Sequence, residues 1–243
     1  MITTLDDFIR EFRRIKDMGW VRTHRSGPTG IGKTLEDLLG IPENNLDEPD
    51  FGEYELKSGR LNTNSMLTIF TRAPQPARSN TYLRMKYGYS STVYDNDEKV
   101  LHSTLNAVSF TPIATTGIKL KVACMDNRIY IVNETEIENV FWDSESLRKA
   151  FNKKYKHKFV YVKAAARGER ASEEFHFVTA HCVSGFDYDA FSALLEQGKI
   201  FVDLRIGQYH GGKNAGKTHD HGTGFRIRDA DQVLLFKNQE QLV

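Results

Sequence analysis

The sequence has 243 residues, and 40% of them are hydrophobic, which is enough for one large core or two smaller ones. The formal charge is only +1, because 33 Lys and Arg residues are offset by 32 Asp and Glu residues. This excludes a protein that holds nucleic acid or a membrane through its overall field, so any basic surface must be local. With only two cysteines, Cys124 and Cys182, the chain has neither a disulfide framework nor a four-cysteine zinc module.

The start of the chain and its hydropathy predict a soluble, cytoplasmic protein that does not enter a membrane. Acidic and basic residues, among them Asp6, Asp7 and Arg10, interrupt the first apolar positions, unlike a signal or transit peptide. No apolar run approaches the ~20 residues that a membrane-spanning helix needs.

Three helices are predicted in the first third of the chain. Apolar residues recur at helical spacing over residues 5–15, with Thr4 as the expected N-cap and Gly19 as the expected end. A short second helix is expected over residues 33–39. A third is expected over residues 80–87.

A hairpin is predicted between the second and third helices. Polar and apolar residues alternate over 53–57, and an apolar run follows at 66–70, which together favour two antiparallel strands. Because side chains two apart on a strand point the same way, Glu53, Glu55 and Lys57 would share one face.

The second half of the chain alternates predicted strands and helices. Residues 118–122 and 129–132 are expected to pair as a hairpin across Asp126 and Asn127. The other expected elements are a helix capped by Asp143 or Ser144, strands near 159–165 and 175–183, a helix that ends at Gly198, and a strand over 200–206. The pattern predicts a mixed α/β fold, and not a doubly wound parallel sheet.

Charge is unevenly distributed beneath the neutral total. Residues 148–170 hold nine Lys or Arg and one acid, and residues 205–228 hold five and one. The stretch 36–55 holds eight acids. A charge run is often only a solvated face, so both that interpretation and a binding surface stay open for the basic stretches.

Residues 27–34, GPTGIGKT, match the G-x-x-x-x-G-K-[ST] spacing of a nucleotide phosphate loop. Such a loop needs a buried parallel strand directly before its first glycine, and residues 20–26, WVRTHRS, do not predict one. We interpret the segment as a glycine-rich turn that leads into the helix carrying Glu36.

Asp50, Glu55 and Lys57 form the pattern with the clearest chemical meaning. Glu55 and Lys57 would present a carboxylate and an ammonium side by side, and Asp50 at the bend before the strand adds a second carboxylate. Two carboxylates with open positions suit Mg²⁺, which retains waters and accepts phosphate oxygens. A lysine beside them can orient an attacking water and stabilise charge on a phosphoryl group. Glu36 could add a third carboxylate. The pattern also occurs on ordinary solvated strands, so chemistry is a hypothesis here.

These residues resemble the MutH-like branch of the PD-(D/E)-x-K nucleases, and within it the MvaI/BcnI-type restriction endonucleases. The similarity covers both ends of the chain in order, at GIGKT (30–34), PDF (49–51), ExK (55–57), DxRIG (203–207) and GKTHDHGT (216–223). Residues from about 89 to 171 match poorly. The resemblance implies a restriction-endonuclease-like core, with residues 1–110 as a catalytic lobe and residues 111–243 as a DNA-recognition lobe, the boundary being approximate.

The resemblance also implies residue roles. Asp50 and Glu55 would bind the catalytic metal, Lys57 would assist the water, and Glu36 would support the site. Relatives carry the same glycine-rich run without using a nucleotide, which argues further against an NTPase.

The carboxy-terminal segment supplies the candidate DNA-binding residues. Arginine and lysine suit phosphates and guanine edges, and Asp220 could accept a hydrogen bond from cytosine. His219 and His221 would share one strand face, so a zinc site with His210 is an alternative that still lacks a fourth ligand. The candidates are Arg205, Tyr209, Lys213, Lys217, His219, Asp220, His221 and Arg226.

Taken together, the residue pattern and this resemblance predict a Mg²⁺-dependent type II restriction endonuclease. By resemblance it would act on double-stranded DNA as a monomer, one strand at a time, at a CCNGG-type site, and the closer similarity to MvaI members favours CCWGG. A cognate DNA methyltransferase would be its functional partner. A MutH-like strand-nicking repair enzyme and a non-catalytic DNA-binding module are the alternatives.

Overall fold

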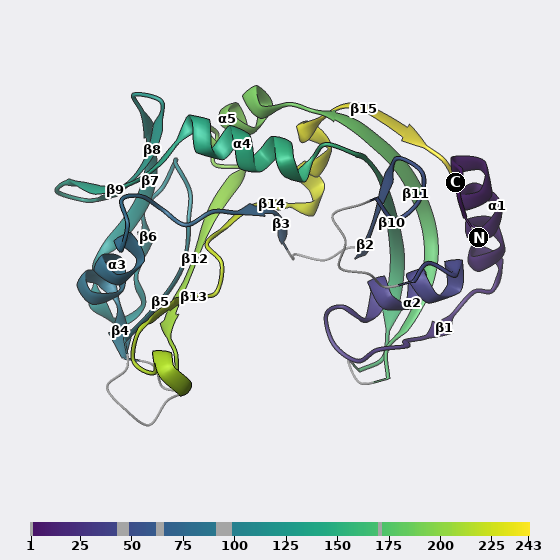
Figure 1. The fold of residues 1–243 in the computed structure, drawn as a ribbon, viewed down its shortest axis with the longest axis horizontal. Helices are drawn as coiled ribbons and strands as arrows, with labels where there is room; N and C mark the ends of the chain where they lie inside the picture. The colour runs from purple at the N-terminus through teal and green to yellow at the C-terminus, as the bar shows by residue number, and fades with distance from the viewer. Residues whose placement is uncertain (1, 43–48, 62–65, 91–98, 170–171) are drawn as a thin grey trace. The chain divides into compact units, whose positions relative to one another are not determined.

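The computed structural model describes residues 2–42, 49–61, 66–90, 99–169 and 172–243 (Figure 1). Its helices and sheets confirm the predicted mixed α/β fold. The chain forms two compact units. Unit 1 contains residues 1–64, 155–186 and 236–243, and unit 2 contains residues 65–154 and 187–235. Within the described ranges, no helix is long and apolar enough to span a membrane.

The two units do not follow the boundary at residue 110 that the sequence predicted. Unit 1 takes its two central strands, β10 (Lys158–Arg167) and β11 (Glu174–Phe186), from the second half of the chain. The reason is pairing: β2 (Tyr54–Arg60) lies parallel to β10, and a parallel partner requires a long crossover. The ranges 1–110 and 111–243 are therefore not the compact units.

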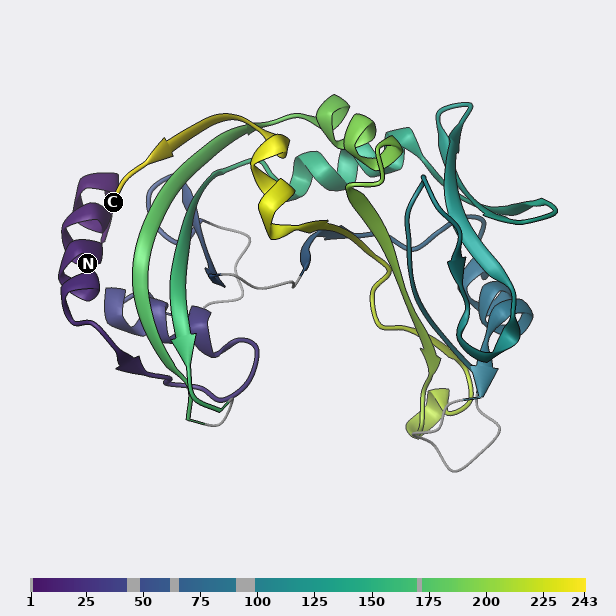
Figure 2. The same ribbon diagram turned by 180° about the vertical axis from the view of Figure 1, so that it is seen from behind.

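Unit 1 is built on one five-stranded sheet. Strand β2 lies at one edge, followed by β10 and β11, and the far side of β11 pairs with β1 (Val21–Arg22) near one end and β15 (Phe236–Gln241) near the other. Strands β10 and β11 run side by side through most of their length, as the view from behind shows (Figure 2). The predicted strands near 159–165 and 175–183 are confirmed and extend further than expected.

The predicted hairpin of residues 53–57 and 66–70 is wrong. Strand β2 pairs with β10 in unit 1, whereas β3 (Met66–Thr71) pairs with β14 (Gly224–Arg228) in unit 2. Both strands exist near their predicted positions, but each finds its partner about a hundred or more residues away. Alternation reveals a strand, and it does not reveal the neighbour that completes the strand's hydrogen bonds.

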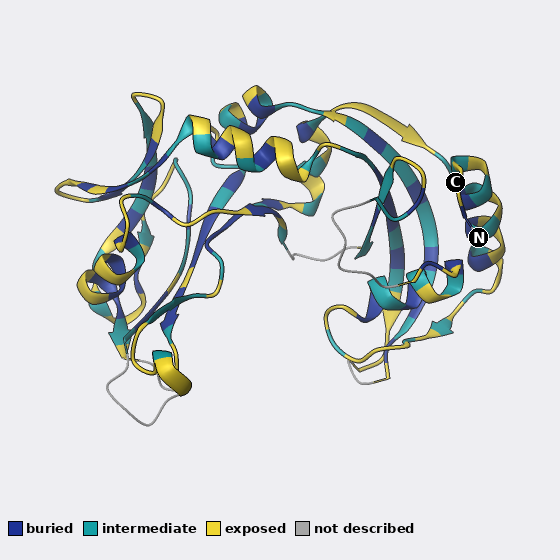
Figure 3. Cartoon of the chain, in the orientation of Figure 1, coloured by how far each residue is buried: buried dark blue, intermediate teal, exposed yellow. Residues whose placement is uncertain are grey.

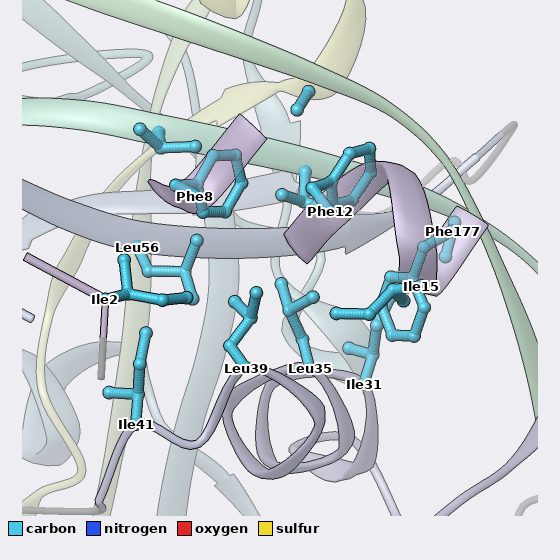
Figure 4. Close-up of a cluster of buried hydrophobic side chains, with 14 of the residues drawn as sticks. Ile2, Phe8, Phe12, Ile15, Ile31, Leu35, Leu39, Ile41, Leu56 and Phe177 are labelled. Atoms are coloured by element: carbon cyan, nitrogen blue, oxygen red, sulfur yellow. The ribbon is translucent and has the colours of Figure 1, made fainter. Parts of the chain in front are cut away.

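The hydrophobic core of unit 1 lies between one face of this sheet and helices α1 (Leu5–Asp17) and α2 (Gly30–Leu39) (Figure 4). The side chains of Leu35 and Leu39 point from α2 toward Phe8 and Phe12 of α1. Helix α1 begins as predicted, because the Thr4 hydroxyl accepts from the Asp7 N–H at 3.1 Å. Leu56 joins the core from β2, so its neighbours Glu55 and Lys57 lie on the opposite face.

Unit 2 contains two antiparallel sheets. The larger consists of β3, β14, β12 (Ile200–Gln208), β5 (Lys99–Leu105) and β4 (Tyr89–Ser90) in that order, with β13 (Thr218–Asp220) also paired to β12. The smaller is a meander of β6 (Thr111–Pro112), β7 (Lys119–Met125), β8 (Arg128–Asn133) and β9 (Ile137–Asp143). The β7–β8 hairpin confirms the turn predicted at Asp126 and Asn127, and both residues have positive φ.

Helices α4 (Ser144–Lys154) and α5 (Tyr188–Glu196) cover an aromatic core in unit 2. Phe70 packs against Phe225 at 4.9 Å between ring centroids and against Phe191 at 5.4 Å. Strand β12 is buried at most of its positions, and Arg205 is its exposed residue. The buried positions along its ribbon are dark blue in Figure 3. Short 3₁₀ turns at Ala114–Thr116, Gly212–Asn214 and Asp229–Leu235 complete the unit.

Helix α3 (Ser79–Tyr87) docks on the smaller sheet through one buried carboxylate. Glu138 is 3% exposed and accepts hydrogen bonds from Tyr82, Tyr87, Lys86 and the Asn133 amide. Burial acts to raise the pKa of Glu138, but these donors outweigh it and hold the pKa below its usual value. The carboxylate therefore joins helix and sheet without an uncompensated charge.

Candidate functional site

A tight turn brings Asp50 to the edge strand of unit 1. Phe51 and Tyr54 pair across the turn, and the Phe51 ring stacks on Phe8 in the core at 5.5 Å. This anchor sends the preceding residue back along β2, where Asp50 Oδ2 accepts the Leu56 N–H at 2.6 Å. A local hydrogen bond thus holds the predicted bend at Asp50. Its donor is a backbone N–H on the outer side of edge strand β2, where the described part of the chain places no further strand.

Glu55 and Lys57 lie on the sheet face opposite the core. Their side chains form an ion pair, with Lys57 Nζ 2.5 Å from Glu55 Oε1. The side chain of Lys57 is 41% exposed, and that of Glu55 is 29% exposed. Glu53 precedes the strand and instead pairs with Lys158. The expected pair of Glu55 and Lys57 on one face is therefore present, and Glu53 is not part of it.

A pocket of about 340 Å³ borders the same strand. Its lining includes Glu36 and Gly32 from α2, and Lys57 and Ser58 from β2. Glu36 Oε1 and Ser58 Oγ both approach Gly32, because a Cβ at that position would lie 3.9 and 3.7 Å from them. The structure thus brings Glu36 to a wall of the pocket that also contains Lys57.

Asp50 carries the distinctive electrostatics of this site. Burial raises the pKa of its carboxyl, and the neighbouring Glu55 charge adds to the rise, while the Leu56 N–H and Lys57 act in the opposite direction. Two carboxylates that share a partly buried site repel each other, so a cation between them would be stabilised.

The donor set can be tested against a divalent ion. Within the described part of the chain, no three His, Cys, Asp or Glu side chains are grouped to hold a metal. Two carboxylates are too few ligands for a metal ion whose whole coordination shell comes from protein side chains. They fit Mg²⁺, which commonly binds through one or two carboxylates and fills its remaining positions with water and substrate phosphate.

The glycine-rich segment has a structural explanation. No parallel strand precedes it, because β1 is two residues long and antiparallel to β11. Gly30 packs against the loop before it so closely that a Cβ at this position would overlap the Arg25 carbonyl oxygen. The helix begins at Gly30, three residues earlier than predicted, and Thr29 provides no side-chain cap. These features agree with a turn and not with a nucleotide phosphate loop.

In unit 2, a buried aspartate organises two of the predicted DNA-binding residues. Asp203 is 6% exposed, and its Oδ2 pairs with Arg205 Nε at 2.7 Å and Arg226 Nη1 at 3.1 Å. Its other oxygen accepts from the Thr104 hydroxyl, and Thr68 accepts from Arg226 Nε. The two guanidinium groups are therefore held on one face of the larger sheet.

The sequence pattern included Asp203 only as part of the DxRIG motif and predicted no role for Asp203, Thr104 or Thr68. The spacing of Asp203 and Arg205, two apart on a predicted strand, was a usable signal because it places both on one face. Thr68 and Thr104 gave no such signal, since they reach this face through pairing of β3 and β5 with distant strands.

The predicted aromatic and histidine residues gather beside this face. The rings of Tyr209 and His219 stack at 4.1 Å, and His219 lies 4.1 Å from His221. Burial lowers the pKa of His221, and the charges of His219, His102 and His210 lower it further. The zinc alternative finds no support in the described residues, which contain no metal-binding group of three.

The remaining three candidates differ in environment. Asp220 accepts from the Asn80 amide at 2.8 Å, from the Gly222 N–H at 2.9 Å and from Thr223, so both of its oxygens already have protein donors. Lys213 is exposed on a 3₁₀ turn, and Lys217 contacts the Asn214 side chain at 3.2 Å.

The combination of an edge strand carrying Glu55 and Lys57 with a mixed sheet is that of a restriction-endonuclease-like protein. The sequence matches the MvaI/BcnI restriction endonuclease family over residues 9–236, nearly the whole chain. The chain therefore belongs to this family and is a site-specific deoxyribonuclease, a type II restriction endonuclease.

Two solved structures are similar to it over their full length. The complex of restriction endonuclease MvaI with its cognate DNA substrate shares 32% identity and a TM-score of 0.79, with 100% of both chains covered. MvaI in the absence of DNA shares 31% identity and a TM-score of 0.61, with 100% of this chain and 99% of that chain covered. The search of curated proteins found no match.

Proposed function

We propose that unit 1 contains the nuclease site and that Asp50, Glu55 and Lys57 carry out hydrolysis of a DNA phosphodiester. The observation that carries this proposal is the gathering of two carboxylates and an ammonium at one edge strand, with Lys57 Nζ 2.5 Å from Glu55. Unit 1 would then be catalytic and unit 2 would recognise DNA.

The side chains have separate roles in this mechanism. Asp50 and Glu55 would each offer a carboxylate oxygen to Mg²⁺, which supplies an acidified water and charge neutralisation when bound. Lys57 stabilises negative charge on the phosphoryl oxygens and orients the attacking water. Glu36 supports the site from the pocket wall, where it can hold water near Lys57.

Recognition would depend on the larger sheet of unit 2. Arg205 and Arg226 are held by Asp203, and a guanidinium fixed in this way is suited to bidentate contact with guanine. Tyr209, His219, His221, Lys213 and Lys217 would add phosphate and base contacts. Because the oxygens of Asp220 have protein donors, we propose that it orients the segment that carries the histidines, in place of the cytosine contact expected from the sequence.

By family resemblance, the substrate would be double-stranded DNA with a CCNGG-type site, CCWGG being favoured. Two arginines held by one aspartate suit a site with paired guanines. The enzyme would act in the cytoplasm as a monomer that cuts one strand at a time. A cognate methyltransferase would protect host DNA without needing to bind the enzyme.

Digestion of a plasmid of known sequence, followed by mapping of the ends, tests this function. We expect linear products with ends at CCWGG in Mg²⁺, none in EDTA, and at least about a 1000-fold loss of single-turnover rate in Lys57→Ala with binding retained. Lys149→Ala, which breaks an exposed ion pair on α4, is the control and should cut normally.

Three outcomes would contradict the proposal. Normal cutting by Lys57→Ala would remove the assigned site. Nicked circles that never become linear would favour the strand-nicking alternative, and specific binding without cleavage at any Mg²⁺ concentration would favour a non-catalytic module.

A further inference from the structure

A second ammonium group lies on the same sheet face as Glu55 and Lys57. In the parallel register, Lys57 is opposite Tyr161 and Gly59 is opposite Lys163, and residues directly opposite each other share a face. Val160 and Val162 belong to the core on the other side, which fixes the direction of Tyr161 and Lys163. Lys163 therefore points to the side of the sheet that carries the candidate catalytic pair.

Gly59 leaves the space that this ammonium uses. A Cβ added to Gly59 would lie 2.6 Å from the Tyr161 hydroxyl and 3.6 Å from Lys163 Nζ. A contact under 3 Å is sterically forbidden, so any larger residue would displace the tyrosine. Both polar groups thus extend from β10 over β2, at the next position on the Glu55–Lys57 face.

The ring of Tyr161 holds the ammonium in place. Lys163 Nζ lies 4.5 Å from the centroid of the ring and 3.4 Å from its hydroxyl. Tyr161 is itself only 7% exposed, so the surrounding protein packs against its ring. On the next strand, His181 is opposite Tyr161, and the Lys163 charge adds to burial in lowering the pKa of His181. The neighbourhood thus favours a neutral His181 beside the Lys163 ammonium.

The spacing of the two lysine positions suits a DNA strand. Two residues along a β-strand span about 6.6 Å, so the space above Gly59 is displaced by roughly that distance from Lys57. Successive phosphates of one DNA strand have a separation of the same order. A cation held over Gly59 can then meet the phosphate next to the one that Lys57 contacts.

We propose that Lys163, oriented by Tyr161 over Gly59, binds the DNA phosphate adjacent to the scissile one and positions the strand for cleavage. This inference rests on the proposed function of the Asp50–Lys57 site. Lys163 is a positioning residue here, since it acts on the backbone beside the reacting phosphate.

The salt dependence of DNA binding by the full chain tests this contact. Lys163→Gln should lower the slope of log K against log[salt] by about 0.9, because one fewer counterion is released. It should weaken binding to cognate and non-cognate duplexes equally, since a phosphate contact carries no sequence information. Lys163→Arg should restore the slope.

Lys158→Gln is the matched control. Lys158 lies on the same strand five positions before Lys163, so alternation places it on the opposite face of the sheet. Its ammonium pairs with Glu53 at 2.7 Å. The control should keep the wild-type slope, and thermal melting of each variant checks the fold. Tyr161→Phe should keep the salt slope, because the ring beside Lys163 remains. It should also relieve the clash that Gly59→Ala creates with the tyrosine hydroxyl, so the Gly59→Ala, Tyr161→Phe double variant should bind DNA more tightly than Gly59→Ala alone.

An unchanged slope in folded Lys163→Gln, or an equal loss in Lys158→Gln, would overturn the proposal. These results are separable from failure of the active-site assignment. If Lys57→Ala is inactive while Lys163→Gln keeps its slope, only the phosphate contact is wrong, and if Lys57→Ala cuts normally, the site itself is wrong.

Discussion

The two units surround a carboxylate in opposite ways: Glu138 in unit 2 is buried among donors, and Asp50 in unit 1 is partly buried beside another carboxylate. In unit 2, Glu138 receives hydrogen bonds from Lys86 and two tyrosines, and they hold its pKa low in spite of burial. In unit 1, burial and the charge of Glu55 raise the pKa of Asp50, and the Leu56 N–H and Lys57 compensate only in part. A carboxylate that the fold neutralises serves structure. One that the fold leaves short of positive charge marks a place where a cation can bind.

The cations show the same contrast. In unit 2, Arg205 and Arg226 share the buried Asp203, so their positions are set by the protein itself. In unit 1, Lys57 forms a half-exposed pair with Glu55, a carboxylate that is also a candidate metal ligand. A fixed guanidinium suits recognition, while an exposed ammonium beside a carboxylate can change partners during a reaction.

Removing the charge from each carboxylate would sharpen this comparison most strongly. Glu138→Gln should lower the free energy of unfolding of unit 2 by about 3 kcal/mol, because Lys86 loses the charge of its buried partner and the amide keeps only one acceptor oxygen for donors that used two. Asp50→Asn should leave stability unchanged or slightly raised without metal, since it removes a charge whose burial is unfavourable. Denaturant titration of each variant measures this.

Trp142 reports on unit 2 in a Trp20→Phe background, which leaves one tryptophan in the chain, and far-ultraviolet circular dichroism follows the unfolding of both units. Glu134→Ala is the control, because its pair with Lys119 is about half exposed and should contribute less than about 1 kcal/mol. Equal losses in Glu138→Gln and Asp50→Asn would break the comparison.

A smaller effect is expected when the aspartate that holds the two arginines loses its charge. Asp203→Asn should reduce discrimination between cognate and single-mismatch DNA by about 1–3 kcal/mol, because the guanidinium groups are no longer fixed. Competition binding with matched duplexes measures the ratio. Asp231→Asn, which only loses a pair with Lys199, should keep it. Unchanged discrimination in Asp203→Asn would place recognition elsewhere.

The smallest expected effect is a shift in pH dependence. Because the pKa of Asp50 is raised, its carboxyl takes up a proton at higher pH than usual, and activity is lost as the pH falls through that pKa. Mg²⁺ and the proton compete for the carboxylate, so more Mg²⁺ should move the acid midpoint of kcat/KM to lower pH, by at most about one unit per tenfold concentration. A midpoint that does not depend on Mg²⁺ would exclude Asp50 as a ligand.

Local patterns predicted much of this molecule. The start of α1, the β7–β8 turn, and the face shared by Glu55 and Lys57 follow from capping residues, turn residues and strand alternation within short windows. The rejection of a nucleotide loop was equally local, because residues 20–26 already lacked the required strand. These features depend on contacts between residues that are near each other along the chain.

Pairing between distant segments could not be predicted in this way. The expected hairpin of residues 53–57 and 66–70 and the boundary at residue 110 were both wrong, because β2 finds its partner in β10 and β3 finds its partner in β14. For the same reason Thr68 and Thr104 were overlooked beside Asp203.

By itself, the sequence determined which side chains are available and how they alternate along each strand: the carboxylates and lysine of residues 50–57 and the basic residues of 205–226. Only the tertiary structure decided that Tyr161 and Lys163 lie over Gly59, and that one aspartate holds two arginines. The physical reason is that backbone hydrogen bonding in a sheet accepts any extended partner, so the burial of distant apolar faces selects which strands meet.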